Sequence, residues 1–319
     1  MSFSFDAFVT DIVFDGGQAA FALGDGRVCW EDGAAHAAHD GAVLAAAAHA
    51  SGSGVITGGD DGRLVWSRPG ATEILAELPN AWIDAVAVGA ASGLVAFAAG
   101  RNLHVRDLAD PKFERRFAHE KTVAGLAFDA KGRRIVSATY GGVALWWARI
   151  ADQKPVMMRW AGSHVAVAFS PDSRFVVSSM QENALHGWRV SDARDMRMGG
   201  YPSKVKSIAF VDGGAWLATA GANGVVLWPF TGADGPMGKQ ATEIGFDDTA
   251  LVTRVAGAGT ILAAGLDDGR VWACDLASQV LKPLKAEKGA PVTALAVHAS
   301  RVAWGDEAGE AGVADLVLA

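Results

Sequence analysis

The sequence predicts an all-β fold built from eight repeats of about 40 residues. Two short motifs each recur eight times along the chain at nearly regular spacing, which indicates a repeat architecture. The hydrophobic residues fall in short runs, and no unit contains a helical periodicity of ten or more residues. Half of the residues are hydrophobic and a fifth are charged, as in a well-buried globular protein. Because the repeats span the chain, we expect residues 1–319 to form one domain.

The first motif is a turn bearing glycine or aspartate that leads into an alternating segment, which ends in most copies at a tryptophan. Its copies end at Trp30, Trp66, Arg106, Trp146, Trp188, Trp228 and Ala273, with a blurred eighth copy near Val313. Successive separations are 36, 40, 40, 42, 40, 45 and about 40 residues. Alternation of polar and apolar residues indicates a strand with one wetter face.

The second motif is a short apolar run that opens each unit. Its copies begin at Val9, Val43, Ile83, Val123, His164, Val205, Val252 and Val292. Continuous apolar runs of this length indicate strands that are buried on both faces. The alanine-rich segment 43–50 has the strongest helix propensity, but it lies in register with seven strand-like copies. We therefore expect a strand there as well.

Two copies of the turn contain paired aspartates, in the tripeptide Asp-Asp-Gly. Asp60 and Asp61 form one pair, and Asp267 and Asp268 form the other at the same position of the repeat. Asp-Gly supplies the positive φ values of a tight hairpin turn, whereas a cation site would need further oxygen ligands. We interpret both pairs as turns between strands.

A unit of about 40 residues with several strands and a tryptophan at a fixed place resembles the WD40-repeat family, and the resemblance covers the whole chain. It implies four-stranded antiparallel blades arranged radially as a β-propeller. We expect eight blades, with seven blades and a degenerate extra unit as the alternative. The eighth unit reaches Ala319 after its third strand, so the alternating segment before Val9 is expected to supply the outer strand of the last blade. Such closure removes exposed sheet edges.

The repeats depart from the family pattern. The dipeptide that gives the family its name is absent after the repeat tryptophans. The family's His–Ser/Thr–Asp–Trp network has three counterparts in the second unit, at His39, Asp61 and Trp66, but Gly58 and Gly59 stand where the hydroxyl is expected.

The fourth unit offers another incomplete network. His119, Thr139 and Trp146 match three roles, while Gly141 replaces the acid. We therefore expect the network to assemble in no unit, and stability to come mostly from apolar packing between blades.

Composition limits the partners. A formal charge of −7 and a pI near 5.6 disfavour binding to nucleic acid or to an anionic membrane. No apolar run reaches the length of a membrane span, and the first residues lack the features of a secretory signal. Cys29 and Cys274 lie far apart and fit a reducing compartment. We expect a cytoplasmic protein, and the alanine- and glycine-rich composition suggests a bacterial source.

Motifs that carry chemistry are absent from the linear sequence. Segment 232–240 resembles a phosphate loop, but Ala233 and Gln240 replace residues that such a loop needs. His36, His39 and His49 lie close in sequence, yet they are interpreted as surface and turn residues rather than zinc ligands. We expect no catalytic residue, no metal and no cofactor. The alternative is a metal-handling, metabolite-binding or enzymatic propeller with a site at the mouth of the central channel.

The resemblance also predicts a binding face, on which the repeat hairpins and the loops entering the inner strands surround the channel. Units three to six bring aromatic and mixed polar residues to it, and the other units bring acids. Aromatic residues and arginine anchor protein interfaces, and an acidic rim attracts a basic segment. We expect a monomeric, non-enzymatic scaffold that binds a protein or peptide, and the acidic residues favour a partner with a basic segment. The predicted contacts are Trp82, Arg101, Tyr140, Trp160, His164 and Tyr201, with Asp60, Asp61, Asp267 and Asp268 as their acidic complement.

Overall fold

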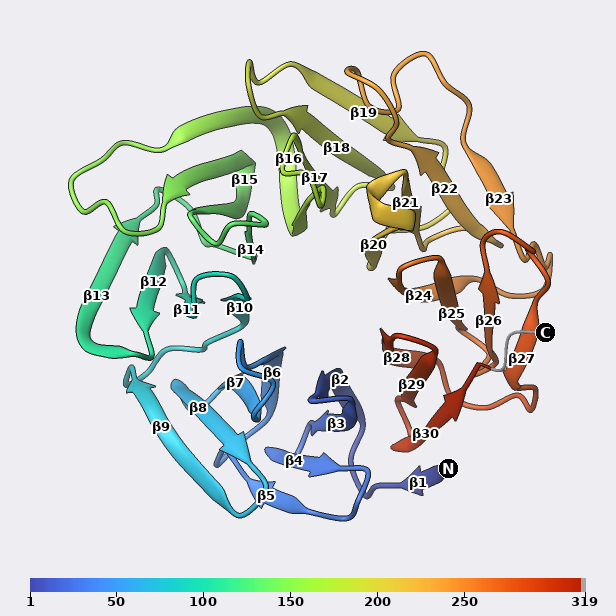
Figure 1. Cartoon of the computed structure of the whole chain (residues 1–319), viewed down its shortest axis with the longest axis horizontal. Helices are drawn as coiled ribbons and strands as arrows, with labels where there is room; N and C mark the ends of the chain where they lie inside the picture. Colours follow the sequence, from blue (N-terminus) through green and yellow to red (C-terminus); the bar gives the residue numbers. More distant parts are fainter. Residues whose placement is uncertain (317–319) are drawn as a thin grey trace.

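The computed structural model describes residues 1–316, which form an all-β ring of radial sheets, as a β-propeller does (Figure 1). In the first three units, the apolar second motif forms the innermost strand and the alternating first motif forms the third strand. These units consist of β2 (Val9–Asp15), β3 (Gln18–Leu23), β4 (Arg27–Trp30), β5 (Ala35–Ala37), β6 (Val43–Ala48), β7 (Val55–Gly59), β8 (Arg63–Arg68), β9 (Ala71–Glu77), β10 (Ala85–Gly89), β11 (Leu94–Ala99), β12 (Asn102–Asp107) and β13 (Asp110–Ala118). The alanine-rich segment is strand β6, as its repeat register predicts.

The other units continue around the ring in chain order. They consist of β14 (Gly125–Phe128), β15 (Arg134–Trp147), β16 (Val156–Phe169), β17 (Phe175–Met180), β18 (Ala184–Arg189), β19 (Asp195–Gly199), β20 (Ile208–Val211), the short 3-10 turn η1 (Asp212–Gly214), β21 (Trp216–Thr219), β22 (Val225–Pro229), β23 (Thr242–Ile244), β24 (Val252–Ala258), β25 (Ile261–Leu266), β26 (Val271–Asp275), β27 (Lys282–Lys285), β28 (Val292–His298), β29 (Arg301–Asp306) and β30 (Glu310–Asp315).

The count of blades differs from the main expectation. Within residues 1–316 the strands form seven antiparallel sheets, not eight: six sheets have four strands and one has six. The cause is β16, whose first half pairs with β15 and whose second half pairs with β17. Units four and five are therefore joined in the sheet β14-β15-β16-β17-β18-β19. Eight sequence repeats thus occupy seven sheets, and the prediction of eight separate blades is corrected.

Strand β15 reverses direction within its length. The hydroxyl of Ser137 donates a hydrogen bond to the carbonyl of Ala144 at 3.2 Å, although seven residues of extended chain span roughly 23 Å. The turn lies at Gly141 and Gly142, whose φ values are +91° and +135°. The two halves of β15 therefore act as the second and third strands of unit four.

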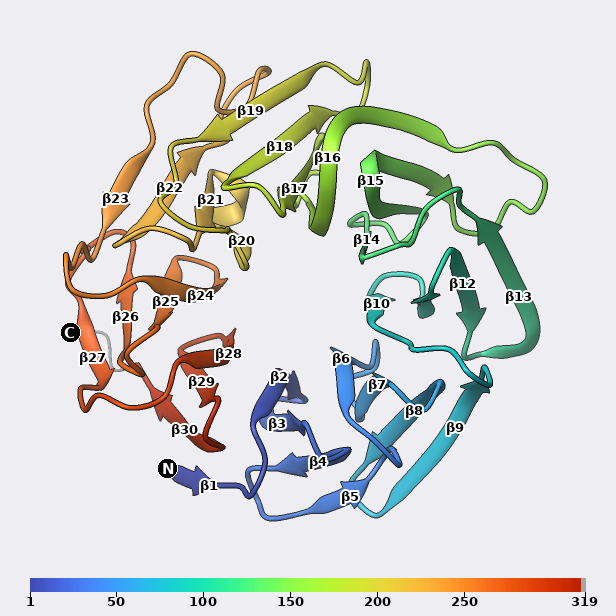
Figure 2. The ribbon, with the colours of Figure 1, turned by 180° about the vertical axis from the view of Figure 1, so that it is seen from behind.

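The predicted closure by an N-terminal strand is confirmed. Strand β1 (Ser2–Ser4) pairs antiparallel with β30, and the two lie side by side in Figure 1 and Figure 2. The rings of Phe3 and Phe5 reach across to Phe21 in the first unit, with centroids 5.3 and 5.4 Å away. The start of the chain thus joins the last sheet to the first.

Apolar packing occurs between neighbouring units. One buried cluster combines Leu103 of unit three with Trp146 of unit four, and another combines Phe175 of unit five with Leu217 of unit six. Burial of a large apolar side chain contributes about 1.5–3 kcal/mol. Within residues 1–316, no helix has the length and apolar character needed to cross a membrane.

The loops divide between two faces of the ring. The hairpin face carries the hairpins between second and third strands and the connections between units. These connections are the loops near residues 5–8, 38–42, 78–84, 119–124, 200–207, 245–251 and 286–291, and the middle of β16 at 160–162. These loops and hairpins touch: the Leu78 N–H donates to the Gly62 carbonyl at 2.8 Å. The opposite face carries the remaining turns, where the Ala130 N–H donates to the Ser173 hydroxyl at 3.0 Å.

Candidate functional site

The hairpin face displays large aromatic side chains. Among the predicted contacts, Trp82 is 65% exposed, Tyr140 63% and Trp160 37%, and Arg101 is also exposed. Phe8 and Phe246 lie exposed on other inter-unit loops of the same face. The sequence prediction did not include these two residues.

Three of the predicted contacts lie near one another around unit four. Tyr140 pairs with Ser163 across β15 and β16, close to Trp160. The carbonyl of Arg101 accepts a hydrogen bond at 2.9 Å from His119, on the loop that enters unit four. Trp82 stands apart, on the loop between units two and three.

Contacts with two buried histidines of unit five fix the position of Trp160. Its ring stacks on the imidazole of His186, with centroids 3.9 Å apart and planes 15° apart. Its carbonyl lies 3.1 Å from Nε2 of His164, whose Nδ1 lies 2.6 Å from the Ser178 hydroxyl. Burial lowers the pKa of both imidazoles below its ordinary value, so they are neutral at pH 7. Trp160 therefore presents a fixed surface.

His164 itself cannot contact a partner, because its side chain is fully buried. The prediction that it belongs to the binding surface is wrong. His164 lies within β16, and its ring points into the blade, where it contacts the Ser178 hydroxyl and the Trp160 carbonyl.

Tyr201 is also buried, and its predicted role as a surface anchor is wrong. Its hydroxyl accepts a hydrogen bond from the indole of Trp228 at 2.6 Å and lies 2.7 Å from Oγ1 of Thr219. Thr219 in turn donates to the carbonyl of Val226 at 3.1 Å. Burial raises the pKa of Tyr201 to about 12. Tyrosine thus takes the place that histidine has in the family's network.

Partial networks of three members form in units two and four as well, and neither unit combines all four members of the family's network, as expected. In unit four, the indole of Trp146 donates to His119 at 3.2 Å and to Ser137 at 3.3 Å, while His119 and Ser137 are 2.8 Å apart. The hydroxyl comes from Ser137 rather than from Thr139, which bonds to the Gly142 carbonyl at 3.3 Å.

In unit two, the hydroxyl comes from Thr57, which precedes the two glycines. His39 lies 2.8 Å from Thr57 and 3.0 Å from Asp61. Trp66 is excluded, because it follows Val65, the cross-strand partner of Thr57, and so lies on the other face of the strand. Its indole donates to the carbonyl of Ser53 at 2.9 Å.

The predicted acidic complement is largely engaged within the protein. Asp61 accepts from the N–H groups of Asp40 and Arg63 as well as facing His39. Asp267 accepts from the Leu251 N–H at 2.9 Å, and Asp268 lies 2.8 Å from Arg270 and 3.3 Å from Lys288. Asp60 makes no side-chain hydrogen bond or ion pair within the described residues. The carboxylates of Asp61, Asp267 and Asp268 therefore stabilise the hairpins and neighbouring loops of the protein itself.

The candidate metal and phosphate segments have structural explanations. The Gly70 N–H donates to His36, and His49 stacks on Trp66 with centroids 4.5 Å apart. Within residues 1–316, no three His, Cys, Asp or Glu side chains gather as a metal site requires. In the loop after β22, Lys239 donates to the carbonyls of Thr231 and Gly235.

A cavity of about 280 Å³ opens beside Tyr140, between the loop that enters unit four and the outer part of that unit. Its lining combines aromatic, apolar and charged groups, among them Glu120, Lys121, Tyr140, Trp146, Met157 and Arg159. The cavity adds a concave feature to a face that otherwise offers protruding rings. The sequence prediction did not include Lys121 or Arg159.

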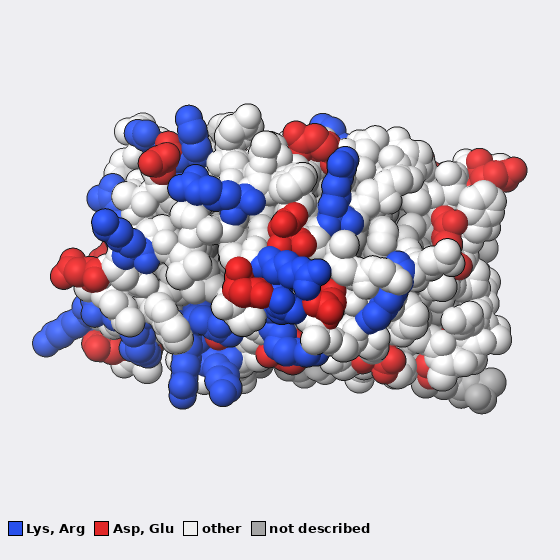
Figure 3. All heavy atoms as spheres, turned by 90° about the horizontal axis from the view of Figure 1, so that it is seen from above, with Lys and Arg blue, Asp and Glu red and all other residues white. Residues whose placement is uncertain are grey.

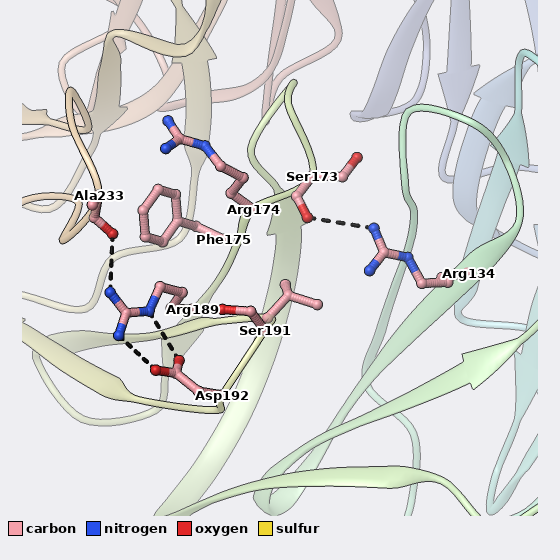
Figure 4. A pocket seen from close by; sticks show the side chains of 9 residues that line it. Arg134, Ser173, Arg174, Phe175, Arg189, Ser191, Asp192 and Ala233 are labelled. Carbon is pink, nitrogen blue, oxygen red and sulfur yellow. Dashed lines mark hydrogen bonds and ion pairs between the residues drawn. The ribbon is translucent and has the colours of Figure 1, made fainter.

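A larger cavity, of about 490 Å³, lies on the opposite face between units four, five and six (Figure 4). Its three arginines all have acidic partners: Arg134 lies 2.7 Å from Asp129, Arg174 2.5 Å from Asp172, and Arg189 2.5 Å from Asp192. Arg189 also donates to the Ala233 carbonyl at 3.3 Å. The charges in this cavity are therefore balanced internally.

Charge is distributed unevenly around the ring. Residues 101–210 contain 18 of the 28 Lys and Arg but only 10 of the 35 Asp and Glu. Figure 3 shows Lys and Arg gathered along the rim over β16 and β19. Units three to five thus form a basic sector in an acidic molecule.

Comparisons with known proteins support the fold. The computationally designed Ika8 protein is similar, with a TM-score of 0.79, 20% identity and 98% of both chains covered. The chain is a β-propeller. A crystal structure of the Cps50 (Swd1) β-propeller domain from Myceliophteria thermophila matches this propeller with a TM-score of 0.67 and 13% identity, over 86% of this chain and 96% of that one. No protein-family model and no curated protein matches the propeller's sequence, consistent with the divergence of its repeats.

Proposed function

We propose that this propeller is a non-enzymatic scaffold that binds a protein or peptide on its hairpin face. The observation that carries the proposal is the set of exposed aromatic residues on this one face, above all Trp82, Tyr140 and Trp160. Exposed aromatic side chains gathered on a rigid surface are typical anchors of protein interfaces.

The support beneath Trp160 favours this function. Its stacking on His186 and the hydrogen bond from its carbonyl to His164 fix the ring before a partner arrives. A side chain that is already ordered loses less conformational entropy on binding. The same face carries Arg101 and the concave cavity beside Tyr140, so it offers both anchors and a recess.

The test compares partner capture by tagged wild type with capture by Trp82→Ala and Trp160→Ala, using lysate of the native organism and mass spectrometry. The matched control is Trp147→Ala, because Trp147 is 46% exposed on the opposite face. We expect the same proteins to be lost with both hairpin-face variants and retained with the control. Unchanged capture by folded variants of both tryptophans would overturn the proposal.

A further inference from the structure

In the lining of the cavity in unit four, Gly141 stands at the repeat position that an acid occupies in unit two. In unit two, Asp61 fills the turn and faces Nδ1 of His39 at 3.0 Å. In unit four the corresponding residue is Gly141, and a Cβ added there would meet no atom within 4 Å. Nδ1 of His119 faces the carbonyl of Phe117 at 3.0 Å instead. The space that the acid occupies elsewhere is open here.

The cations that line this cavity lack acidic partners. Within the described residues, neither Lys121 nor Arg159 makes an ion pair or a side-chain hydrogen bond, although both are exposed. The one acid in the lining, Glu120, is also without an ion pair there. In the larger cavity on the opposite face, by contrast, every arginine is paired. Of these two cavities, the one in unit four is therefore the one whose cations are not neutralised by an ion pair.

Other groups in the lining suit an acidic side chain. Tyr140 is 63% exposed and carries a hydroxyl that can donate a hydrogen bond. Trp146 and Met157 supply apolar surface deeper in the cavity. A guanidinium recognises carboxylate and phosphate oxygens through paired hydrogen bonds, and an ammonium adds a compact charge.

We propose that this cavity binds an anionic oxygen group, a carboxylate or a phosphate, on a peptide segment of the partner. Arg159 and Lys121 provide the charge, Tyr140 provides a hydroxyl donor, and Trp146 contacts the apolar part of the same side chain. This inference rests on the proposed function, because the cavity opens on the hairpin face. It predicts an acidic segment at the basic sector of the ring, whereas the sequence suggested a basic segment at the acidic half.

The test uses three fluorescein-labelled peptides of ten residues with one shared apolar framework, carrying three glutamates, three phosphoserines or three lysines. Fluorescence anisotropy measures their affinity for the full chain. We expect one or both acidic peptides to bind more tightly than the lysine peptide. The two acidic probes distinguish carboxylate from phosphate as the preferred group.

Two double variants locate the binding. Lys121→Gln with Arg159→Gln is expected to weaken the acidic peptides at least tenfold, since a charge-assisted hydrogen bond contributes a factor of roughly ten or more. The control, Lys131→Gln with Arg133→Gln, removes the same charge from two exposed residues on the opposite face of unit four, which make no side-chain ion pair within the described residues. We expect it to change affinity less than twofold.

The inference is overturned if neither acidic peptide binds, if the lysine peptide binds equally well, or if both double variants lose affinity alike. Failure of the proposed function appears separately. Trp82 and Trp160 do not line the cavity, so unchanged partner capture by their alanine variants would overturn the scaffold function while leaving selective binding of acidic peptides intact.

Discussion

The hydroxyl groups of Tyr201 and Thr219 lie 2.7 Å apart inside the sixth unit, closed off from solvent. Together with the indole of Trp228 and the carbonyl of Val226, they form a chain in which each hydroxyl both donates and accepts. Buried polar groups are tolerated when every one is paired.

Tyr201→Phe should therefore destabilise the protein without affecting partner binding. The substitution leaves the indole of Trp228 and the hydroxyl of Thr219 without their shared partner, which costs about 1–2 kcal/mol of unfolding free energy. Urea unfolding measures this loss. Tyr140→Phe serves as the control, because Tyr140 is exposed and its change should leave stability unaltered. Equal stability of the two variants would contradict the hydrogen-bonded arrangement of Tyr201, Thr219 and Trp228.

The adjacent aspartates of the second hairpin should respond differently to removal. Asp61→Ala takes an acceptor from His39 and from the N–H groups of Asp40 and Arg63, so we expect a loss of about 2 kcal/mol in unfolding free energy. Asp60→Ala removes no side-chain hydrogen bond found within residues 1–316, and should change stability by less than about 0.5 kcal/mol. A comparable effect of the two substitutions would contradict the stabilising role of the Asp61 hydrogen bonds in the hairpin.

The contacts that close the ring should be needed for stability and solubility. Phe3→Ala with Phe5→Ala removes two half-buried rings that pack against Phe21, at a cost of about 2 kcal/mol or more. If β1 then detaches, the edge of β30 is left unpaired and open to self-association. Urea unfolding and light scattering measure the two effects. Ser2→Ala, at an exposed position of β1 whose side chain makes no hydrogen bond found within residues 1–316, is the control and should keep the protein stable and monodisperse.

The pH dependence of stability should contain a contribution from Asp11. Burial raises the pKa of its carboxyl from 3.8 to about 6, against hydrogen bonds from the N–H groups of Ile12 and Ala46 and attraction from Arg254. Between about pH 4 and pH 6 the folded protein holds a proton that the unfolded chain has released, so this contribution to stability falls as pH rises through that window.

Asp11→Asn removes this titration. The unfolding free energy of the variant, relative to that of the wild type, should therefore increase from pH 4 to pH 7. Urea unfolding of both proteins at intervals across this range measures the difference, in which the titration of other groups cancels. A difference that stays constant with pH would contradict the raised pKa of Asp11.

The repeat register was sufficient to predict the strands, the ring and its closure. It placed a strand at Val43–Ala48 against the helix propensity of alanine, and it assigned the segment containing Phe3 to the last sheet. Such features depend on periodicity, which is visible in the sequence because every unit repeats it.

Other features depend on choices that periodicity does not contain. The continuous hydrogen bonding of β16 to two neighbouring strands, which joins units four and five, depends on the path of one strand. The burial of His164 depends on which face of β16 its ring takes, and that of Tyr201 on how its ring turns out of the loop after β19. A shift of one residue places Trp66 on the other face of β8, away from Thr57. Thr57, Ser137 and Thr219 each follow their His or Tyr partner by 18 residues, a spacing that the sequence prediction did not use.

The pairing of Ser2 with Gly312 also determines when the ring can close during synthesis of the protein. Strand β1 is synthesised before every other described strand, and its partner β30 is synthesised after all of them. The early units can form and stack while β1 waits, because each packs mainly against its neighbours. Contacts so distant in sequence form slowly, so ring closure should be the last step of folding. Until then, the rings of Phe3 and Phe5 remain exposed and able to contact other molecules.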